Sequence, residues 1–318
     1  MKKYGIPLLI LLLILLMIQG LYIVESEPEK PEPGVFRYSD YEYIQLPDGT
    51  VEIVGYTGEA AEVTVPQTLD GHSVTRIGDG AFFACDFLTG ITLPEGLTGI
   101  GHRVFSNCSS LTGITLPDSV TEMGINPFVY CEKLTDIRVS PDQPVFATID
   151  GVLFNKTEKK LICYPCAFTA SEYQVPKGIL SIGDDAFSGC DSLTSITLPE
   201  GLTSIGDYAF YWCTSLMNIT LPEGLTSIGD NAFSGCFALT SITLPEGLTS
   251  IGDSAFSACK SLQSITLPES LTSIGNWVFE YCPEDMQFTV VRDSWAAKWC
   301  KENGKAYIYP DSMDWLND

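Results

Sequence analysis

Eight cysteines recur at a constant interval, and their thiols offer the widest chemistry in this sequence. They are spaced 23 residues apart within two sets, and the 59-residue gap between the sets equals 23 plus 36. The cysteines are Cys85, Cys108, Cys131, Cys190, Cys213, Cys236, Cys259 and Cys282. Thiols of an exported protein could form disulfides. Equivalent positions in stacked repeats, however, point in parallel and lie roughly 4.8 Å apart, which favours a ladder of buried free thiols.

Two other arrangements resemble sites of redox or metal chemistry. Cys163-Tyr-Pro-Cys166 has the form of a redox CxxC motif. It stands at the end of an expected hairpin strand, whereas a redox motif opens a helix after a βαβ strand. His72 and His102 lack the local spacing of a metal or nucleophilic site, which favours core-edge or surface positions. We therefore predict no catalytic residue, no cofactor and no metal site, and a protein that is not an enzyme.

Carboxylates form two rows in the second set of repeats. One row is Glu200, Glu223, Glu246 and Glu269, and the other is Asp184, Asp207, Asp230 and Asp253. Such rows could hold Ca²⁺, but a calcium site needs about six to eight converging oxygens and one carboxylate per repeat supplies few. A solvated acidic face is the favoured interpretation. The net charge of -23, from 40 acidic and 17 basic residues, also disfavours binding to nucleic acid or to an anionic lipid surface.

The residues around each cysteine recur with the same period. A phenylalanine stands three residues before each of the eight cysteines, and an isoleucine or methionine followed by glycine stands eight residues before it. A fixed period of roughly 20 to 50 residues is typical of a solenoid, whose units are too small to fold alone. We therefore predict a repeat solenoid with a core dominated by eight stacked phenylalanines.

The residue types along one repeat predict the course of the chain through one coil. Ile242 to Leu244 alternates apolar, polar and apolar side chains, which indicates one short strand per coil with one face inward. Pro245 cannot donate the next ladder hydrogen bond, so it ends the strand, and Gly247 turns the chain. Gly252 then permits a bend into a single helical turn that inserts Phe256 into the core.

The pattern L-x-x-I-x-L-P-x-x-L-x-x-I-G-x-x-A-F-x-x-C resembles the repeat of the BspA-like leucine-rich repeat family over about residues 63–290. Tyr41 to Tyr56 looks like the family's N-terminal strand cap, and Ser294 to Tyr309 like its closing helix and strand. The resemblance implies a leucine-rich repeat arc with short parallel strands and single helical turns, capped over residues 35–62 and 291–318. Such caps shield the end coils from water and from edge pairing.

One coil is interrupted. Between Val139 and Val175 the chain has 36 residues in place of 23. Two apolar runs around Asn155 to Lys160 predict a β-hairpin that bulges from the solenoid, as an insert of about residues 140–174.

The N-terminal residues have the composition of an export signal. Lys2 and Lys3 precede an uninterrupted apolar run from Ile6 to Ile18. Extended to Val24, the apolar stretch reaches 19 residues, close to the ~20 that span a bilayer. Residues 1–24 are therefore a signal peptide or a membrane anchor, and 25–34 an acidic, Pro-rich linker. We expect an extracellular or cell-surface protein that meets the membrane only through this segment.

Variable positions of the repeat hold aromatic residues where other coils have Ser, Gly or Ala. The candidate partner-binding residues are Tyr208, Tyr211, Trp212, Phe237, Trp277 and Tyr281, and Phe83 and Tyr130 stand at similar variable positions. Exposed aromatics on a rigid acidic scaffold are typical of a recognition surface, because they contribute contact area at small entropic cost. The alternative for each residue is that it covers the edge of a coil.

Three functional hypotheses follow. The resemblance implies adhesion, so the first is a non-enzymatic exported protein that binds extracellular or host surface proteins, with extracellular matrix components as the partner class. The second is a cell-envelope hydrolase or a glycan-associated module, which a second domain with paired carboxylates would support. The third is a structural spacer without a specific ligand, whose aromatic residues would not cluster in space.

Overall fold

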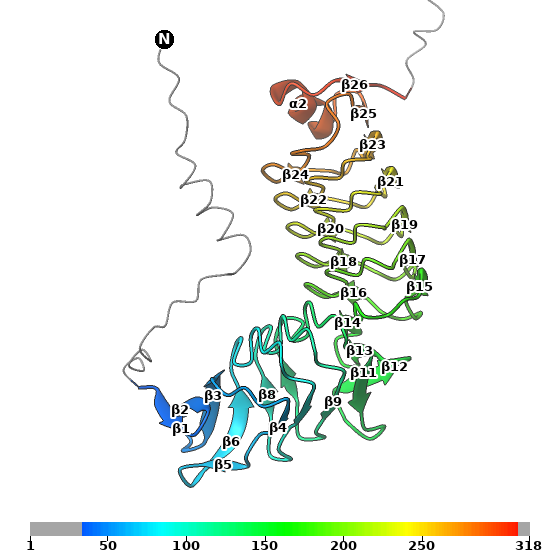
Figure 1. Ribbon diagram of the computed structural model, residues 1–318. Coiled ribbons are helices and arrows are strands. Elements are labelled where there is room, and N and C mark those ends of the chain that lie inside the picture. Colours follow the sequence, from blue (N-terminus) through cyan, green and yellow to red (C-terminus); the bar gives the residue numbers. More distant parts are fainter. Residues whose placement is uncertain (1–33, 311–318) are drawn as a thin grey trace, which may run out of the picture. The chain divides into compact units, whose positions relative to one another are not determined.

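The computed structural model of the protein describes residues 34–310 (Figure 1). Residues 36–310 belong to one compact unit, which includes every element below. The expected signal or anchor at 1–24 and the linker at 25–34, apart from Gly34, lie outside the described residues. Among residues 34–310, no helix combines the length and the apolar composition needed to cross a membrane.

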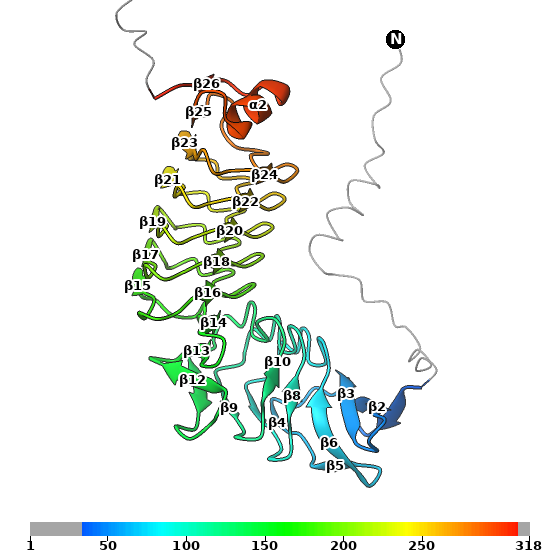
Figure 2. The same ribbon diagram turned by 180° about the vertical axis from the view of Figure 1, so that it is seen from behind.

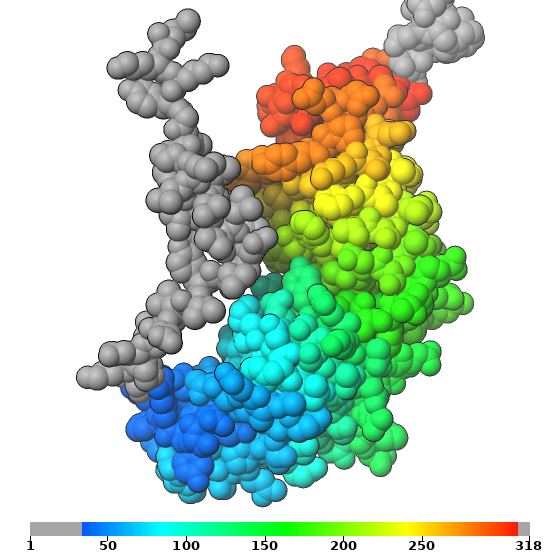
Figure 3. Space-filling model, viewed as in Figure 1, coloured from blue at the N-terminus to red at the C-terminus, as the bar shows by residue number. Residues whose placement is uncertain are grey.

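The chain is a repeat solenoid, as predicted, and each regular coil adds two short parallel strands instead of one (Figures 1 and 2). One strand is the expected Ile-Thr segment, and the other is a Ser-Ile pair farther along the coil. Strands pair with their equivalents 23 residues later, as Ile205 with Ile228 and Ile228 with Ile251. Figure 3 shows the coils as adjacent bands that run from green through yellow to red.

Two sheets carry the N-terminal half of the solenoid. The first has the order β1 (Phe36–Tyr38), β2 (Tyr41–Gln45), β3 (Val51–Tyr56), β6 (His72–Ile77), β8 (Gly99–Ile100) and β10 (Glu122–Met123), with β5 (Thr68–Leu69) paired to β6. The second has the order β11 (Asp136–Val139), β9 (Gly113–Leu116), β7 (Gly90–Thr92) and β4 (Glu62–Thr64).

Three sheets carry the C-terminal half. The first runs β12 (Phe146–Ile149), β13 (Val152–Asn155), β14 (Lys160–Cys163), β16 (Ser181–Ile182), β18 (Ser204–Ile205), β20 (Ser227–Ile228), β22 (Ser250–Ile251) and β24 (Ser273–Ile274). The second runs β15 (Glu172–Gln174), β17 (Ser195–Thr197) and β19 (Asn218–Thr220). The third runs β21 (Ser241–Thr243), β23 (Ser264–Leu267), β25 (Gln287–Val290) and β26 (Tyr307–Ile308).

Each regular coil bends at a five-residue turn segment with the core phenylalanine at its centre, for example residues 231–235. The amides of Asn231, Phe233 and Gly235 donate to carbonyls of the next coil at 2.8, 2.8 and 2.9 Å. The Ser234 amide instead donates to the Asn231 carbonyl at 3.1 Å, within the segment. The first and fifth residues have positive φ, 55° and 78°. The structure thus has a turn with two left-handed residues where the sequence predicted a single helical turn.

Stacked aromatic rings form the centre of the core. Phe210, Phe233 and Phe256 are fully buried, with successive centroids 5.1 and 5.3 Å apart and planes 9° and 2° apart. Two tyrosines extend the stacks of the two halves: Tyr56 lies 5.0 Å from Phe82, and Tyr164 lies 5.1 Å from Phe187. A column is the set of residues at the equivalent position of successive coils. Tyr56 and Tyr164, which lie outside the regular repeat, therefore continue the predicted phenylalanine column.

Free thiols line up beside the ring stack. Cys236 Sγ donates to the Phe210 carbonyl at 3.2 Å, and Cys259 Sγ donates to the Phe233 carbonyl at 3.2 Å. Equivalent contacts are made by Cys108, Cys131, Cys190, Cys213 and Cys282. Burial raises the pKa of the Cys236 thiol well above its ordinary value, so the thiol stays protonated and can donate. This arrangement agrees with the predicted ladder of buried free thiols.

The insert is a three-stranded antiparallel meander of β12, β13 and β14. All four residues of β13 are buried. β14 also pairs in parallel with β16, through Leu161 and Ile182, and so begins the ladder of the C-terminal half. The expected hairpin forms, but the prediction that it bulges from the solenoid was wrong, because apolar side chains on both faces of β13 must be covered.

Caps close both ends of the solenoid. β1, β2 and β3 pair antiparallel, and β3 joins β6 in parallel. At the other end the helix α2 (Trp295–Glu302) begins after Ser294, whose Oγ accepts the Ala297 amide at 3.1 Å. Cys300 is buried in the core cluster of the C-terminal half, and β26 pairs with β25.

We predict that Phe233→Ala lowers the free energy of unfolding by about 3 to 5 kcal/mol, the range for truncating a buried aromatic ring. Because contacts in a solenoid are between neighbouring coils, amide hydrogen exchange should accelerate first in the coils of Phe210 and Phe256. Denaturant unfolding measures the loss, and a loss below ~1 kcal/mol would show that the ring does not contribute to the core.

We also predict that the destabilisation caused by Cys236→Ala depends on pH. The raised pKa of the folded thiol means that its contribution is complete below its ordinary pKa of 9.0 and is lost as the pH rises. The cost of the substitution should therefore fall by about 1.4 kcal/mol between pH 8 and pH 10. Denaturant unfolding of the unchanged protein and of Cys236→Ala at the two pH values tests this. Ser234→Ala is the control, because it removes no group that titrates in this range. An equal cost at both pH values would contradict the prediction.

Candidate functional site

Four of the six candidate residues occupy the left-handed positions of turn segments. Tyr208 and Trp277 are first residues, with φ of 56° and 54°, and Trp212 and Tyr281 are fifth residues, with φ of 55° and 60°. Most other coils have Gly, Asn, Asp, Ser or Ala at these positions. Positive φ is uncommon for L-residues, is an outlier for bulky ones, and costs about 1 to 3 kcal/mol. Folding alone therefore does not account for aromatic side chains at these positions.

Four candidates form one aromatic patch, consisting of Tyr208, Tyr211, Trp212 and Phe237. Tyr208 and Tyr211 meet edge to face with centroids 5.4 Å apart, as do Trp212 and Phe237 at 5.3 Å. Tyr211 and Trp212 link the two pairs at 6.2 Å. Trp212 is 46% exposed, and the other three are half-buried. The indole lies against Gly235 of the next coil, where an added Cβ would be 3.0 Å from Trp212 Cδ1.

Two basic side chains cover the ends of the aromatic patch. The Arg103 guanidinium carbon lies 5.7 Å from the centroid of the Tyr208 ring. Lys260 Nζ lies 4.4 Å from the centroid of the Phe237 ring. Both distances are within cation–π range. Within residues 34–310, no cation of the chain covers Tyr211 or Trp212 in this way.

The two remaining candidates lie apart from the aromatic patch. Trp277 is 67% exposed and Tyr281 is 72% exposed. No ring contact among the described residues joins either of them to the four patch residues. The structure therefore brings together Tyr208, Tyr211, Trp212 and Phe237 and leaves these two as isolated surface aromatics.

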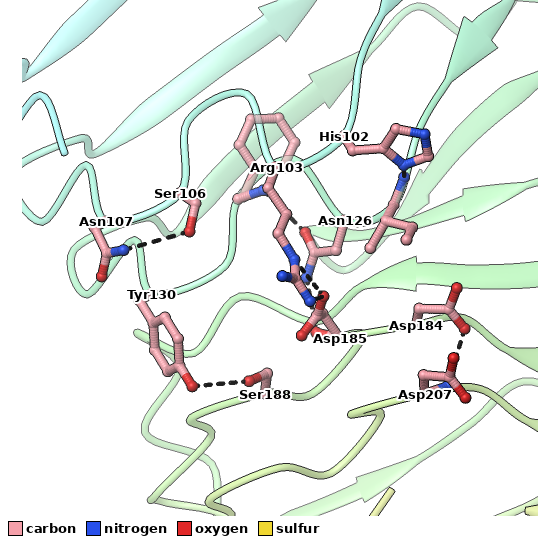
Figure 4. A network of polar contacts seen from close by, with 12 residues as sticks. His102, Arg103, Ser106, Asn107, Asn126, Tyr130, Asp184, Asp185, Ser188 and Asp207 are labelled. Atoms are coloured by element: carbon pink, nitrogen blue, oxygen red, sulfur yellow. Dashed lines mark hydrogen bonds and ion pairs between the residues drawn. The ribbon is translucent and has the colours of Figure 1, made fainter. Parts of the chain in front are cut away.

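Polar contacts beside the aromatic patch join coils on either side of the insert (Figure 4). Arg103 Nη2 lies 2.5 Å from Asp185 Oδ2 and its Nε 2.8 Å from the same oxygen. Burial raises the pKa of the Asp185 carboxyl, and Arg103 acts in the opposite direction by stabilising the charged form. Tyr130 also reaches across, with its hydroxyl 3.3 Å from Ser188 Oγ.

Asn126 replaces a contact that the insert removes. In regular coils the phenylalanine amide donates to the next coil, but the coil that follows Phe128 contains the insert. Asn126 Oδ1 accepts the Phe128 amide at 3.0 Å instead, and Asn126 Nδ2 donates to the Asp185 carbonyl at 2.9 Å. The side chain thus satisfies the backbone on both sides of the interruption (Figure 4).

A cavity of about 470 Å³, the junction pocket, lies where these coils meet the aromatic patch. It is lined by Tyr130, Glu132, Cys166, Gly189, Asp191, Tyr211 and Trp212. Gly189 is a left-handed fifth residue with φ of 72°, and a Cβ there would lie 2.9 Å from Tyr130 Cε1. A side chain at Gly189 would therefore displace the Tyr130 ring.

The sequence analysis named Cys166 only as part of the CxxC motif, and it missed three other residues of this pocket, namely Glu132, Gly189 and Asp191. The signal that could have found part of it is the fifth position of the turn segment, which Tyr130, Gly189 and Trp212 share. Cys166 stands in the same column, 23 residues before Gly189, just as Tyr164 stands 23 residues before Phe187.

The histidines and the aspartate row make structural contacts, and His72 Nδ1 lies 3.0 Å from the Gly49 carbonyl oxygen. His102 Nδ1 accepts the Ile125 amide at 2.9 Å, which places the ring proton on Nε2 (Figure 4). Asp207 Oδ1 accepts the Asp230 amide at 2.8 Å, and the same contact recurs along the row. Within the range 34–310, no group of three or more His, Cys, Asp or Glu side chains is placed to hold a metal ion.

The CxxC cysteines lack the environment of a redox pair. Cys163 is the last residue of β14, as the sequence predicted, and is buried. Burial raises the pKa of its thiol well above the ordinary value. A reactive cysteine needs a lowered pKa. The observed shift is in the opposite direction.

The chain matches the family model described as BspA type leucine rich repeat region over residues 56–170 and 162–285, with 6 copies of the repeat. No curated protein matches the chain.

Solved structures share the fold. A leucine rich cell surface protein from Faecalibacterium prausnitzii is 23% identical, with a TM-score of 0.52 over 90% of this chain and 97% of that one. The pneumococcal vaccine antigen PcpA is 20% identical, with a TM-score of 0.58 over 88% of this chain and 100% of that one. A leucine-rich repeat protein from Eubacterium ventriosum is 22% identical, with a TM-score of 0.50 over 77% of this chain and 93% of that one.

We predict that Tyr281→Gly raises the free energy of unfolding by about 1 kcal/mol, because glycine adopts the left-handed conformation without steric cost. Phe83→Gly is the matched control, since Phe83 is also exposed, at 59%, but does not have positive φ. It should lower stability, as glycine does at ordinary positions. Denaturant unfolding compares the two, and a loss of stability in Tyr281→Gly equal to that of the control would refute the strain at this position.

Proposed function

Because the chain belongs to the BspA type leucine-rich repeat family, we propose that it is a protein-binding repeat protein that contacts its partner through the aromatic patch. The observation that carries this proposal is the cluster of Tyr208, Tyr211, Trp212 and Phe237. Two of these residues hold strained left-handed positions that glycine or asparagine occupies in the next coil. Strained residues of this kind persist at sites where function maintains them.

The chemistry of the aromatic patch indicates the partner. Tyr and Trp are the residues most enriched at binding hot spots, since they offer a large apolar surface with a polar edge. Asp207 and Asp230 lie nearby as exposed carboxylates in the coils of the patch, and the whole chain carries a net charge of -23. A partner with apolar and basic groups would complement this surface.

We further propose that the protein is exported, is not an enzyme, and binds extracellular or host surface proteins as an adhesion molecule. Lys2, Lys3 and the apolar run from Ile6 to Ile18 support export. The similarity in fold to a leucine rich cell surface protein supports the cell surface as its location.

The distribution of the aromatic residues weighs against a mere structural spacer. A spacer predicts scattered aromatics, which describes Trp277 and Tyr281 but not the four residues of the aromatic patch. A glycan-associated module would also use exposed aromatic rings, so glycans belong in the same experiment as proteins.

The test is a binding array of extracellular proteins and glycans, probed with the chain and with the double variant Tyr211→Ser and Trp212→Gly. These replacements are the residues that the next coil has at the same positions, Ser234 and Gly235, so folding should be preserved. We expect the double variant to bind the partner at least about 30-fold more weakly, which corresponds to about 2 kcal/mol.

The matched control is the double variant Trp277→Ser and Tyr281→Ala, which introduces Ser254 and Ala258 of the preceding coil. It removes two aromatic residues outside the aromatic patch and should leave affinity unchanged. Equal affinity of all three proteins for a saturable partner would place the binding site elsewhere and end this proposal.

A further inference from the structure

The junction pocket combines aromatic walls with two carboxylates. Tyr130, Tyr211 and Trp212 provide the rings, and Glu132 and Asp191 are both exposed. Its volume of about 470 Å³ is of the size that takes a small ligand or one long side chain. The pocket is thus acidic, partly aromatic and open to a group from outside.

Glycine at one position allows an aromatic wall of the pocket to form. Tyr130, Gly189 and Trp212 are all fifth residues of turn segments, and all three have positive φ. Gly189 has no side chain, so the Tyr130 ring lies against it, and an added Cβ would be 2.9 Å from Tyr130 Cε1. Tyr130 and Trp212, two wall residues of the pocket, both have a strained backbone, with φ of 59° and 55°. Strain at two wall residues of one pocket is what a functional site retains.

The carboxylates of the pocket are available to an outside cation. Among residues 34–310, neither Glu132 nor Asp191 takes part in an ion pair. Asp191 Oδ1 accepts a hydrogen bond from Thr214 Oγ1 at 2.6 Å, which fixes the position of the carboxylate. Burial, with a smaller contribution from the Glu132 and Asp191 carboxylates, raises the pKa of the Cys166 thiol to about 11. The part of this shift that comes from the two carboxylates reflects a negative potential, which favours a cation.

The chain itself shows what the neighbouring rings bind. Arg103 and Lys260 already lie over Tyr208 and Phe237, the two ends of the aromatic patch. The rings between them, Tyr211 and Trp212, face the junction pocket without a cation from the described part of the chain. A cation from a partner would complete the same pattern.

We propose that the junction pocket binds the guanidinium group of an arginine side chain presented by the partner protein. The proposal rests on the proposed function, because it names the group of the partner that the aromatic patch surrounds. Arginine fits better than lysine, since its planar guanidinium stacks on an indole or phenol ring while its N–H groups donate to carboxylates. The compact ammonium of lysine makes only one of these contacts well.

The test is titration of the full chain, labelled with 5-fluorotryptophan, with N-acetyl-arginine amide. Trp212 is one of five tryptophans, and its fluorine signal is assigned by its loss in Trp212→Gly. We expect a saturable shift of this signal with a Kd on the order of 1 mM, as for one buried cationic group. N-acetyl-citrulline amide, which has the same shape without the charge, should bind at least tenfold more weakly.

Two double variants separate the local carboxylates from the net charge. Glu132→Gln with Asp191→Asn should weaken binding of the arginine probe at least tenfold. Glu223→Gln with Glu246→Gln removes two exposed carboxylates of other coils and should leave the affinity unchanged. Equal shifts with arginine and citrulline, or equal weakening in both double variants, would overturn the proposal.

The outcomes for the pocket and for the proposed function can be told apart. If a partner requires Tyr211 and Trp212 but the arginine probe leaves the Trp212 signal unmoved, the pocket proposal fails and the proposed function stands. The opposite outcome has two parts: the probe binds and Glu132→Gln with Asp191→Asn abolishes that binding, but the partner binds the Tyr211→Ser and Trp212→Gly variant with unchanged affinity. In that case the pocket proposal holds and the proposed function fails.

Discussion

The hydrogen bonds from each turn segment to the next coil are the constraint on which the rest of the structure depends. Three alternate amides, such as those of Tyr208, Phe210 and Trp212, all donate along the solenoid axis to carbonyls of the following coil. The chain meets this requirement by adopting a left-handed conformation at both ends of the segment. That geometry sets each phenylalanine over the next and leaves its carbonyl to accept a cysteine thiol from the following coil. The 23-residue repeat is the sequence that satisfies these contacts together.

The same constraint explains which residues are free to serve function. The second and third residues of a turn segment, such as Ala209 and Phe210, are buried, whereas the first, fourth and fifth vary from coil to coil, and the first and fifth have strained backbone where φ is positive. Glycine and asparagine relieve that strain at Asn231 and Gly235, so aromatic residues at Tyr208 and Trp212 oppose the stability of the fold. Conflict between a local preference and the residue observed is expected at functional sites. Trp277 and Tyr281 have the same strain, so what sets Tyr208 and Trp212 apart is that they are both strained and part of one cluster.

Much of the fold could be predicted from the sequence, because each column reports a contact that every coil repeats. The solenoid, the phenylalanine stack and the thiol ladder follow from period and residue type. The left-handed positions could not be predicted so directly, since Tyr and Trp obscure a column that Gly and Asn would have marked. The second strand of each coil has only two residues, as at Ser227–Ile228, which is too short to show a period. The aromatic patch was partly predictable, because Tyr211 and Phe237 lie in neighbouring coils, but Trp277 gave the same signal without joining it.

The junction pocket arises where the repeat is broken. The coil that contains the insert contributes Tyr164 to the ring stack, and the Tyr164 amide donates to the Ala186 carbonyl at 2.8 Å as in a regular turn segment. Cys166 instead directs its thiol to the Cys131 carbonyl at 3.6 Å. The coils on either side of the insert then form hydrogen bonds with each other directly, from Arg103 to the Asp185 carboxylate and from Asn126 to the Asp185 carbonyl (Figure 4). An unbroken stack would set identical turn segments side by side and leave little room between them. The junction pocket lies at this interruption while the surrounding ladder holds its walls in place, so a rigid repeat gains a specific pocket at the point where it departs from its own pattern.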